Sequence, residues 1–242
     1  VYDDGCVSVD MDASYNSAFI VQYGEFESTR YDKLHLTPCG EVMPLISRWD
    51  WLEEKLLALG AAGMSFELEA GRAPTVLTIT RSDELHLFEE RYATPLCFEA
   101  TMPGVCRRLV FSGGERRADV LINLTNDGWF GSSVAGRENH LLAARWRCVE
   151  LRTPMVRAAN TGISSFIESN GSVVARAPAN EEAVLTHRVV LPTGSTLYAR
   201  LGDLLGWLCL AATVVIAGVS IAPRRTPGDP GRSVDRAAPQ PT

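Results

Sequence analysis

A thiol, an amine and a group of carboxylates lie in separate blocks of this sequence, in an order that suits acyl-transfer chemistry. Cys97 lies in TPLCFE, downstream of an apolar, β-branched run from Pro74 to Thr80. Lys33 precedes it in YDKLHLTPCGE, and the block NLTNDGWFG follows it. A cysteine thiolate can attack the carbonyl of an amide or ester, and nearby positive charge or N–H donors stabilise the oxyanion that forms. The blocks therefore predict a thiol nucleophile supported by a lysine.

Each of these residues also has a simpler reading. An isolated cysteine is most often a small buried hydrophobe, and a lone lysine is most often a solvated surface charge. A tight turn after a strand and a proline would expose the sulfur of Cys97 and make the backbone N–H of Phe98 an oxyanion donor. Lys33 would neutralise the same oxygen and favour the thiolate. Their neighbouring blocks favour the functional reading for Cys97 and Lys33.

The composition narrows the class of protein. The chain has 242 residues, of which 46% are hydrophobic and 21% charged, so a sizeable core is possible. The net charge of −6 and the lack of a basic stripe argue against nucleic acid as a partner. The six cysteines are scattered without a CxxC pair, which argues against a zinc site and against a disulfide framework. We expect no metal and no organic cofactor.

Alternating strands and helices must position these blocks, and the pattern predicts an α/β domain. The predicted strands are Ser17–Gln22, Pro74–Thr80, Val120–Leu124, Met155–Ala159, Ser164–Glu168 and Ser172–Ala177. The predicted helices are Ile46–Leu59 and Asn139–Leu151, the second ended by Thr153-Pro154. Asn170-Gly171 predicts a two-residue hairpin turn between the last two strands.

The C-terminal part of the sequence is uncharged from Leu204 to Pro223 and is followed by Arg224-Arg225. About 20 apolar residues match the thickness of a bilayer, whereas a buried core helix, the alternative, is usually shorter. Positive flanks prefer the cytoplasmic side. We therefore expect a folded domain over residues 1–200, a transmembrane helix over 201–223 and a disordered cytoplasmic tail over 224–242.

Four blocks together resemble the nitrilase, or carbon–nitrogen hydrolase, superfamily. They are the lysine block around Lys33, the CFE motif at Cys97, the NDGWFG block that begins at Asn126, and the block RAANTGIS that begins at Arg157. The segment LPTGSTLYARLGD, which runs into the apolar stretch, resembles the apolipoprotein N-acyltransferase branch. The resemblance implies a nitrilase-type four-layer α-β-β-α sandwich, here incomplete at its N-terminal end.

The resemblance also implies a Glu-Lys-Cys triad in which Cys97 is the nucleophile and Lys33 stabilises the tetrahedral intermediate. Glu41 and Glu99 match acidic positions that hold the lysine or the loops, and Phe98 supports through its N–H. The family's general-base glutamate lies well upstream of the lysine, in a proline-glutamate context. The acids that precede Lys33 lack that context: Asp3, Asp4, Asp10, Asp12, Glu25 and Glu27. We expect the base to be absent and this chain to be a C-terminal fragment of a longer enzyme.

The branch implies an N-acyltransferase that takes an acyl chain from a phospholipid and transfers it to the N-terminal diacylglyceryl cysteine of an apolipoprotein. It implies the bacterial cytoplasmic membrane as the location, with the catalytic domain on the outer face. Two alternatives use the same residues. One is a membrane-anchored amidase that hydrolyses a small amide, and the other is an inactive truncated domain that lacks its base.

Overall fold

The computed structural model describes residues 2–3, 6–7, 13–38, 40–42, 68–82, 87–191 and 193–221. The chain divides into two compact units, Val1–Gly202 and Asp203–Thr242. All of the candidate residues belong to the first unit. The predicted helix Ile46–Leu59 and the predicted disordered tail 224–242 lie outside the described residues.

A six-stranded sheet is the frame of the first unit, with the strand order β12-β11-β10-β9-β6-β5. Its strands are β5 (Leu77–Ser82), β6 (Leu87–Ala93), β9 (Val120–Asn126), β10 (Met155–Asn160), β11 (Ser165–Ile167) and β12 (Val173–Arg176). The central strands β6, β9 and β10 are parallel, and the outer pairs are antiparallel. The α/β class predicted from the sequence is confirmed.

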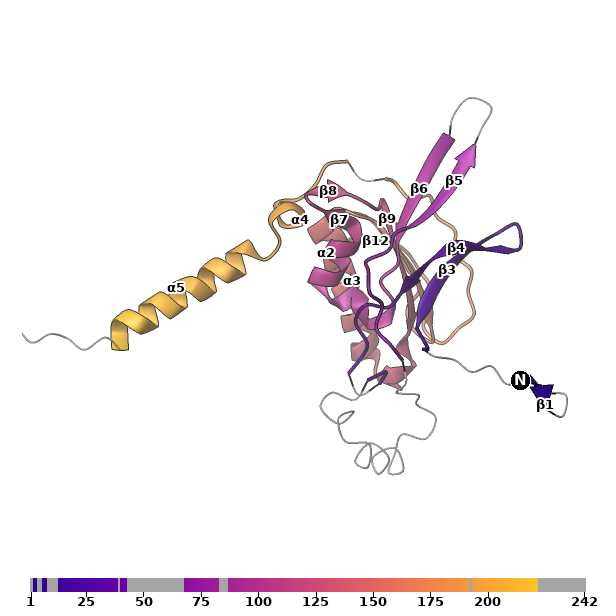
Figure 1. Cartoon of the computed structure of the whole chain (residues 1–242), viewed down its shortest axis with the longest axis horizontal. Helices are drawn as coiled ribbons and strands as arrows, with labels where there is room; N and C mark the ends of the chain where they lie inside the picture. The colour runs from indigo at the N-terminus through magenta and orange to yellow at the C-terminus, as the bar shows by residue number, and fades with distance from the viewer. Residues whose placement is uncertain are drawn as a thin grey trace, which may run out of the picture. The chain divides into compact units, whose positions relative to one another are not determined.

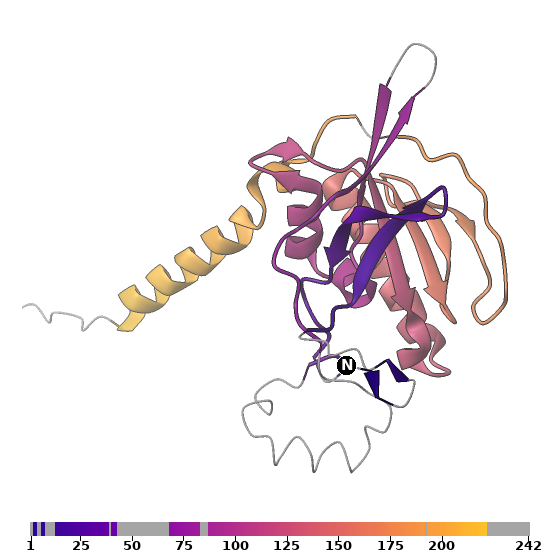
Figure 2. The same ribbon diagram turned by 45° about the vertical axis from the view of Figure 1, so that its right-hand side comes forward.

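Two helices connect the parallel strands, because a parallel pair needs a crossover rather than a tight turn. Helix α2 (Pro103–Val110) joins β6 to β9, and α3 (Val134–Leu151) joins β9 to β10. Both lie on one face of the sheet (Figure 1, Figure 2). Proline at the first turn starts α2, while the Ser133 hydroxyl caps α3 by accepting from the N–H of Gly136 at 3.1 Å.

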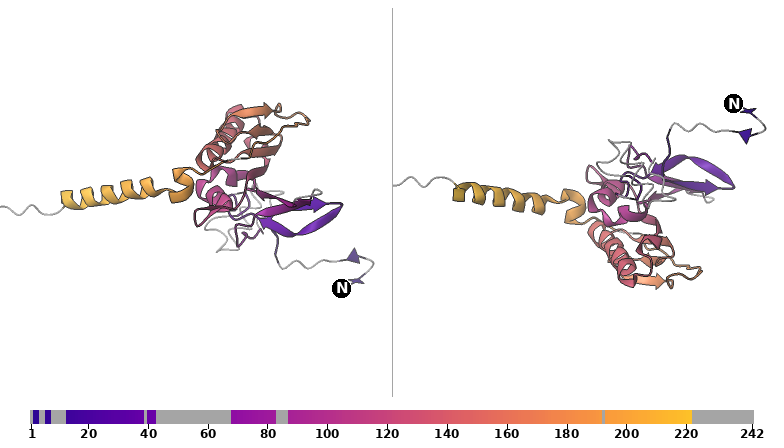
Figure 3. Two further views of the ribbon diagram at one scale, coloured as in Figure 1. Left: turned by 90° about the horizontal axis from the view of Figure 1, so that it is seen from above. Right: turned by 90° about the horizontal axis from the view of Figure 1, so that it is seen from below.

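The core lies between these helices and the sheet, as the view from above indicates (Figure 3). Leu109 of α2, Leu121 of β9, Leu151 of α3 and Met155 of β10 are almost completely buried there. Helix α3 ends at Arg152, which takes a left-handed conformation with φ of 50°. Packing of this kind fixes where the carboxyl ends of β6, β9 and β10 lie.

The described residues also contain three two-stranded sheets. They pair β1 (Tyr2–Asp3) with β2 (Cys6–Val7), β3 (Ser17–Gln22) with β4 (Glu25–Asp32), and β7 (Phe111–Ser112) with β8 (Glu115–Arg116). The predicted strand Ser17–Gln22 coincides with β3, whereas β4, β6 and α2 were not predicted. The described ranges hold one large sheet, so a second large sheet of the four-layer sandwich is not among them.

The hairpin between β11 and β12 differs from the prediction. The N–H of Gly171 donates to the carbonyl of Glu168, and the N–H of Glu168 donates to the carbonyl of Ser172. The loop therefore has three residues, not two, and Gly171 takes the left-handed conformation with φ of 82°. Such a loop needs glycine at this position.

The predicted span over 201–223 does not form one continuous helix. Gly202, with φ of 64°, ends α4 (Leu197–Leu201), and α5 (Leu204–Ile221) begins after it. No helix in the described ranges combines the length and the apolar character that a membrane crossing requires. The predicted transmembrane helix is not supported.

Candidate active site

The candidate blocks meet where the three parallel strands end. Cys97 follows β6, Asn126 closes β9, and Asn160 closes β10. The carboxyl ends of adjacent parallel strands share one edge of a sheet, which is where α/β folds place their sites. The Sγ atom of Cys97 lies 3.9 Å from the carbonyl oxygen of Asn126. Three of the four sequence blocks are therefore brought together by topology.

Cys97 stands in a strained backbone conformation at the start of η1 (Cys97–Thr101). Its φ is 49°, which a residue with a side chain rarely adopts, and its side chain is half-buried. By contrast, Cys106 and Cys148 are fully buried. Burial raises the pKa of Cys106 to about 12 and raises that of Cys148 as well. The structure thus favours Cys97 over both as the reactive thiol.

Lys33 is fully buried, although it is charged, because the loop after β4 surrounds its ammonium group with acceptors. Nζ forms an ion pair with Glu41 and donates to the Thr37 hydroxyl at 3.1 Å. Glu41 also accepts from the N–H of Thr37 and from the Asn16 amide, both at 2.8 Å. A buried charge is tolerated only with such pairing, so this loop is built around Lys33.

The electrostatics of Glu41 suit a positioning group better than a base. Burial raises the pKa of its carboxyl, but the hydrogen bonds from Lys33, Thr37 and Asn16 outweigh burial and hold the pKa below the ordinary value. A carboxylate with a lowered pKa accepts protons poorly. Glu41 therefore holds the lysine ammonium in place rather than competing for a proton.

The lowered pKa of Glu41 predicts a specific acid sensitivity. A carboxylate whose pKa is lower in the folded state stabilises the fold above its ordinary value of 4.5, and that contribution is lost as the pH falls through the lowered pKa. We expect the free energy of unfolding in urea, measured from about pH 7 to about pH 3, to fall less steeply below 4.5 in Glu41→Gln than in the unmodified chain. Identical slopes would contradict this assignment.

Glu99 connects two segments by hydrogen bonds: the loop after β4 that contains Lys33 (the lysine loop) and the turn Pro95–Cys97 (the cysteine turn). Its Oε1 accepts from the N–H groups of Leu34 at 2.8 Å and His35 at 2.9 Å. Its Oε2 accepts from the Tyr31 hydroxyl and from the N–H of Leu96, both at 2.8 Å. Burial raises the pKa of this fully enclosed carboxyl, although these bonds oppose the rise. Lys33 and Cys97 are thus placed relative to each other through Glu99.

Glu99→Gln is expected to lower the free energy of unfolding by about 2–3 kcal/mol, since an amide would turn an NH2 group toward at least one existing donor. Tyr31→Phe, which removes a single donor from the same carboxylate, should cost about 1 kcal/mol. Chemical denaturation of both variants measures the two values. A Glu99→Gln variant as stable as Tyr31→Phe would show that the four bonds are not all made in solution.

Asp127, His140 and Arg157 form a second buried cluster. Asp127, in η2 (Asp127–Phe130), accepts from Arg157 at 2.8 and 3.0 Å, and its Oδ1 lies 2.8 Å from Nδ1 of His140. Burial raises the pKa of Asp127, but His140 and Arg157 outweigh it, so the pKa is lowered. Gly162 is required here because a Cβ would lie 2.1 Å from the Asp127 Oδ2.

Asn123 and Arg157 also belong to the site, although the sequence did not predict a role for either side chain. Asn123 donates to the carbonyl of Pro95 at 2.7 Å and to that of Cys97 at 3.3 Å, and it accepts from Arg157. Both side chains are buried in strands that otherwise read as apolar. A polar residue at such a position is the signal that could have identified them.

The remaining predicted residues lie as follows. Phe98 is 37% exposed, and its role as an oxyanion donor stays a prediction. Glu25 and Glu27 are exposed in β4, and Asp3 lies in β1. Asp4, Asp10 and Asp12 lie outside the described residues.

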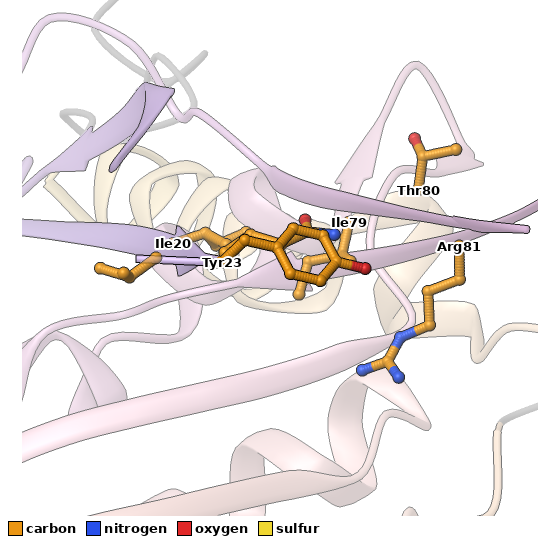
Figure 4. A pocket seen from close by; sticks show the side chains of 7 residues that line it. Ile20, Tyr23, Ile79, Thr80 and Arg81 are labelled. Carbon is orange, nitrogen blue, oxygen red and sulfur yellow. The ribbon is translucent and has the colours of Figure 1, made fainter. Parts of the chain in front are cut away.

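A separate hollow lies between β3 and β5 (Figure 4). Ile20, Tyr23, Ile79, Thr80 and Arg81 are among its lining residues, and none of the candidate catalytic residues is. The chemistry is therefore assigned to the strand ends rather than to this hollow.

The chain is similar to known proteins in sequence. The carbon-nitrogen hydrolase family matches residues 5–197. The chain is 34% identical to an apolipoprotein N-acyltransferase of Geobacter metallireducens, over 85% of this chain and 36% of that protein. It is 36% identical to an apolipoprotein N-acyltransferase of Bradyrhizobium diazoefficiens, over 84% of this chain and 35% of that protein.

The chain therefore spans about a third of the length of these relatives. Among solved structures, a carbon-nitrogen hydrolase from Helicobacter pylori G27 is similar with a TM-score of 0.48 and 14% identity. That similarity covers 69% of this chain and 54% of the other.

Proposed function

The chain belongs to the carbon-nitrogen hydrolase family, and from that premise we propose that it carries the nucleophile of an apolipoprotein N-acyltransferase. The donor would be a phospholipid, and the acceptor would be the N-terminal amine of a diacylglyceryl-cysteine lipoprotein. The observation that carries the proposal is the enclosed Lys33–Glu41 pair, which Glu99 ties to the turn of Cys97. The names of the curated relatives support an apolipoprotein as the acceptor.

In the first step, the Cys97 thiolate attacks an ester carbonyl of the phospholipid. The C–S bond forms, the ester C–O bond breaks, and the lysophospholipid alkoxide leaves and takes back the proton that the general base had removed from the Cys97 thiol. Negative charge develops on the carbonyl oxygen in the transition state. The Lys33 ammonium, already desolvated and held by Glu41, would stabilise that charge without reorganising.

In the second step, the free amine of the lipoprotein attacks the thioester. The C–N bond forms, the C–S bond breaks and the Cys97 thiolate is regenerated, while the amine gives up a proton. The amine must be unprotonated to attack, so a proton acceptor is needed. Glu41 is a weak base, and Glu99 already accepts four hydrogen bonds. We therefore assign the general base to the part of the relatives' length that this chain does not cover.

The acceptor distinguishes this proposal from the amidase alternative, in which water takes the acyl group. The test is to load Cys97 with an acyl chain and add a synthetic diacylglyceryl-cysteine peptide. Conversion of its amine to an amide supports acyl transfer. Release of free fatty acid at the same rate with and without the peptide would favour hydrolysis. The location on the outer face of the bacterial cytoplasmic membrane stays a prediction.

A further inference from the structure

Two polar side chains occupy fully buried positions in the central strands, where apolar residues would be expected. Asn123 of β9 is 0% exposed and Arg157 of β10 is 2% exposed. They lie opposite each other in the parallel register of β9 and β10. Burying an amide and a guanidinium side by side is costly unless both are fully engaged. The hydrogen bonds of Asn123 and Arg157 therefore indicate the role of these two side chains.

The side-chain amide of Asn123 donates hydrogen bonds to the backbone of the cysteine turn. Its Nδ2 donates to the carbonyl of Pro95 at 2.7 Å and to that of Cys97 at 3.3 Å, on either side of the nucleophile's own N–H. The left-handed conformation of Cys97 is of a kind that costs about 1–3 kcal/mol and persists only where the surroundings enforce it. Asn123 supplies part of that enforcement.

Arg157 fixes the orientation of Asn123. Its Nη1 donates to the Asn123 Oδ1, which leaves the Asn123 NH2 group directed at the two carbonyls. Its Nη2 donates to both oxygens of Asp127 and lies 3.1 Å from Nδ1 of His140. Burial lowers the pKa of Arg157, whereas the Asp127 carboxylate raises it.

We propose that Asn123 and Arg157 are positioning residues for the nucleophile: Asn123 clamps the strained turn of Cys97, and Arg157 orients that clamp. This inference rests on the proposed role of Cys97.

The test is the plateau rate of iodoacetamide alkylation at Cys97, read by mass spectrometry of its peptide in the full chain. Arg157→Met is expected to slow alkylation about tenfold, because the Asn123 amide is no longer oriented toward the turn. Arg157→Lys keeps a donor for the Asn123 Oδ1 and should restore most of the rate. Arg116→Met is the matched control. It removes a half-buried arginine that donates to the carbonyls of Leu151 and Gly194, so it should leave the rate unchanged.

An unchanged rate in Arg157→Met would overturn the inference, as would an equal loss in Arg116→Met. If Arg157→Met does not fold, Asn123→Asp decides, because it can still pair with Arg157 but lacks the clamping N–H groups. Alkylation about tenfold slower at its plateau supports the clamp, and an unchanged rate overturns it. Alkylation needs no lipid, so slowed alkylation in these variants, with no acyl transfer by the unmodified protein, would refute the proposed function while leaving this inference intact.

Discussion

Replacing Cys97 with alanine is expected to abolish the acyl-thioester and to lower acyl transfer by at least about 10³-fold in the complete enzyme. The reason is that Cys97 follows β6 at the strand ends, whereas Cys106 and Cys148 are buried in the core. Cys97→Ser should lose the thioester equally, because a serine hydroxyl is a far weaker nucleophile near neutral pH. Intact-mass measurement of the acylated protein reads the result.

Cys148→Ser is the matched control for the choice of nucleophile. Burial raises the pKa of this thiol, and its Sγ donates to the carbonyl of Ala144 within α3 at 3.5 Å, so it has no path to a substrate. The variant should keep the adduct, with only a modest loss of stability from a hydroxyl placed in the core. Equal loss of the adduct in Cys97→Ser and Cys148→Ser would contradict the assignment.

Lys33→Met is expected to reduce acyl transfer by about 10²–10³-fold, because the oxyanion loses its desolvated cation. It should also lower the free energy of unfolding by about 3 kcal/mol, since Glu41 is left without its ion-pair partner in a mostly buried loop. Steady-state transfer kinetics and urea denaturation measure the two effects. An active Lys33→Met variant would remove the lysine from the mechanism.

The double variant Lys33→Met/Glu41→Gln separates catalysis from folding. Removing both charges takes away the unpaired carboxylate, so stability should recover most of the loss, whereas acyl transfer should stay as low as in Lys33→Met. Recovery of both quantities would mean that Lys33 acts only by holding its loop. Recovery of neither would show that Thr37 and Asn16 cannot accommodate the neutral pair.

The strands that carry the site could largely be predicted, because their β-branched runs are short and bounded by turn residues. Predicted Ser17–Gln22, Val120–Leu124 and Met155–Ala159 correspond to β3, β9 and β10. Strand β6 was missed because three consecutive charged residues interrupt LFEERYA. It pairs with β9 in the sheet all the same, so tertiary context outweighed local preference there. Helix α2 was hidden by its length of 8 residues.

The site could be predicted only in part, and the reason is physical. Cys97, Lys33 and Glu41 lie within sequence blocks that resemble family motifs, so the sequence identified them as candidate site residues. Asn123 and Arg157 become partners only through the register of β9 and β10, which no local pattern encodes. The fourfold coordination of the Glu99 carboxylate likewise depends on two loops far apart in sequence.

The most direct test of the central claim is intact mass spectrometry of this chain in detergent with phosphatidylethanolamine. The nucleophile and its lysine lie within the described residues, and the general base is assigned to the part of the relatives' length that this chain does not cover. We therefore predict no acyl adduct on this chain alone, and a hydroxylamine-labile adduct on Cys97 when the chain is extended upstream to the length of its relatives. An adduct on neither protein would contradict acyl transfer from phospholipid through Cys97.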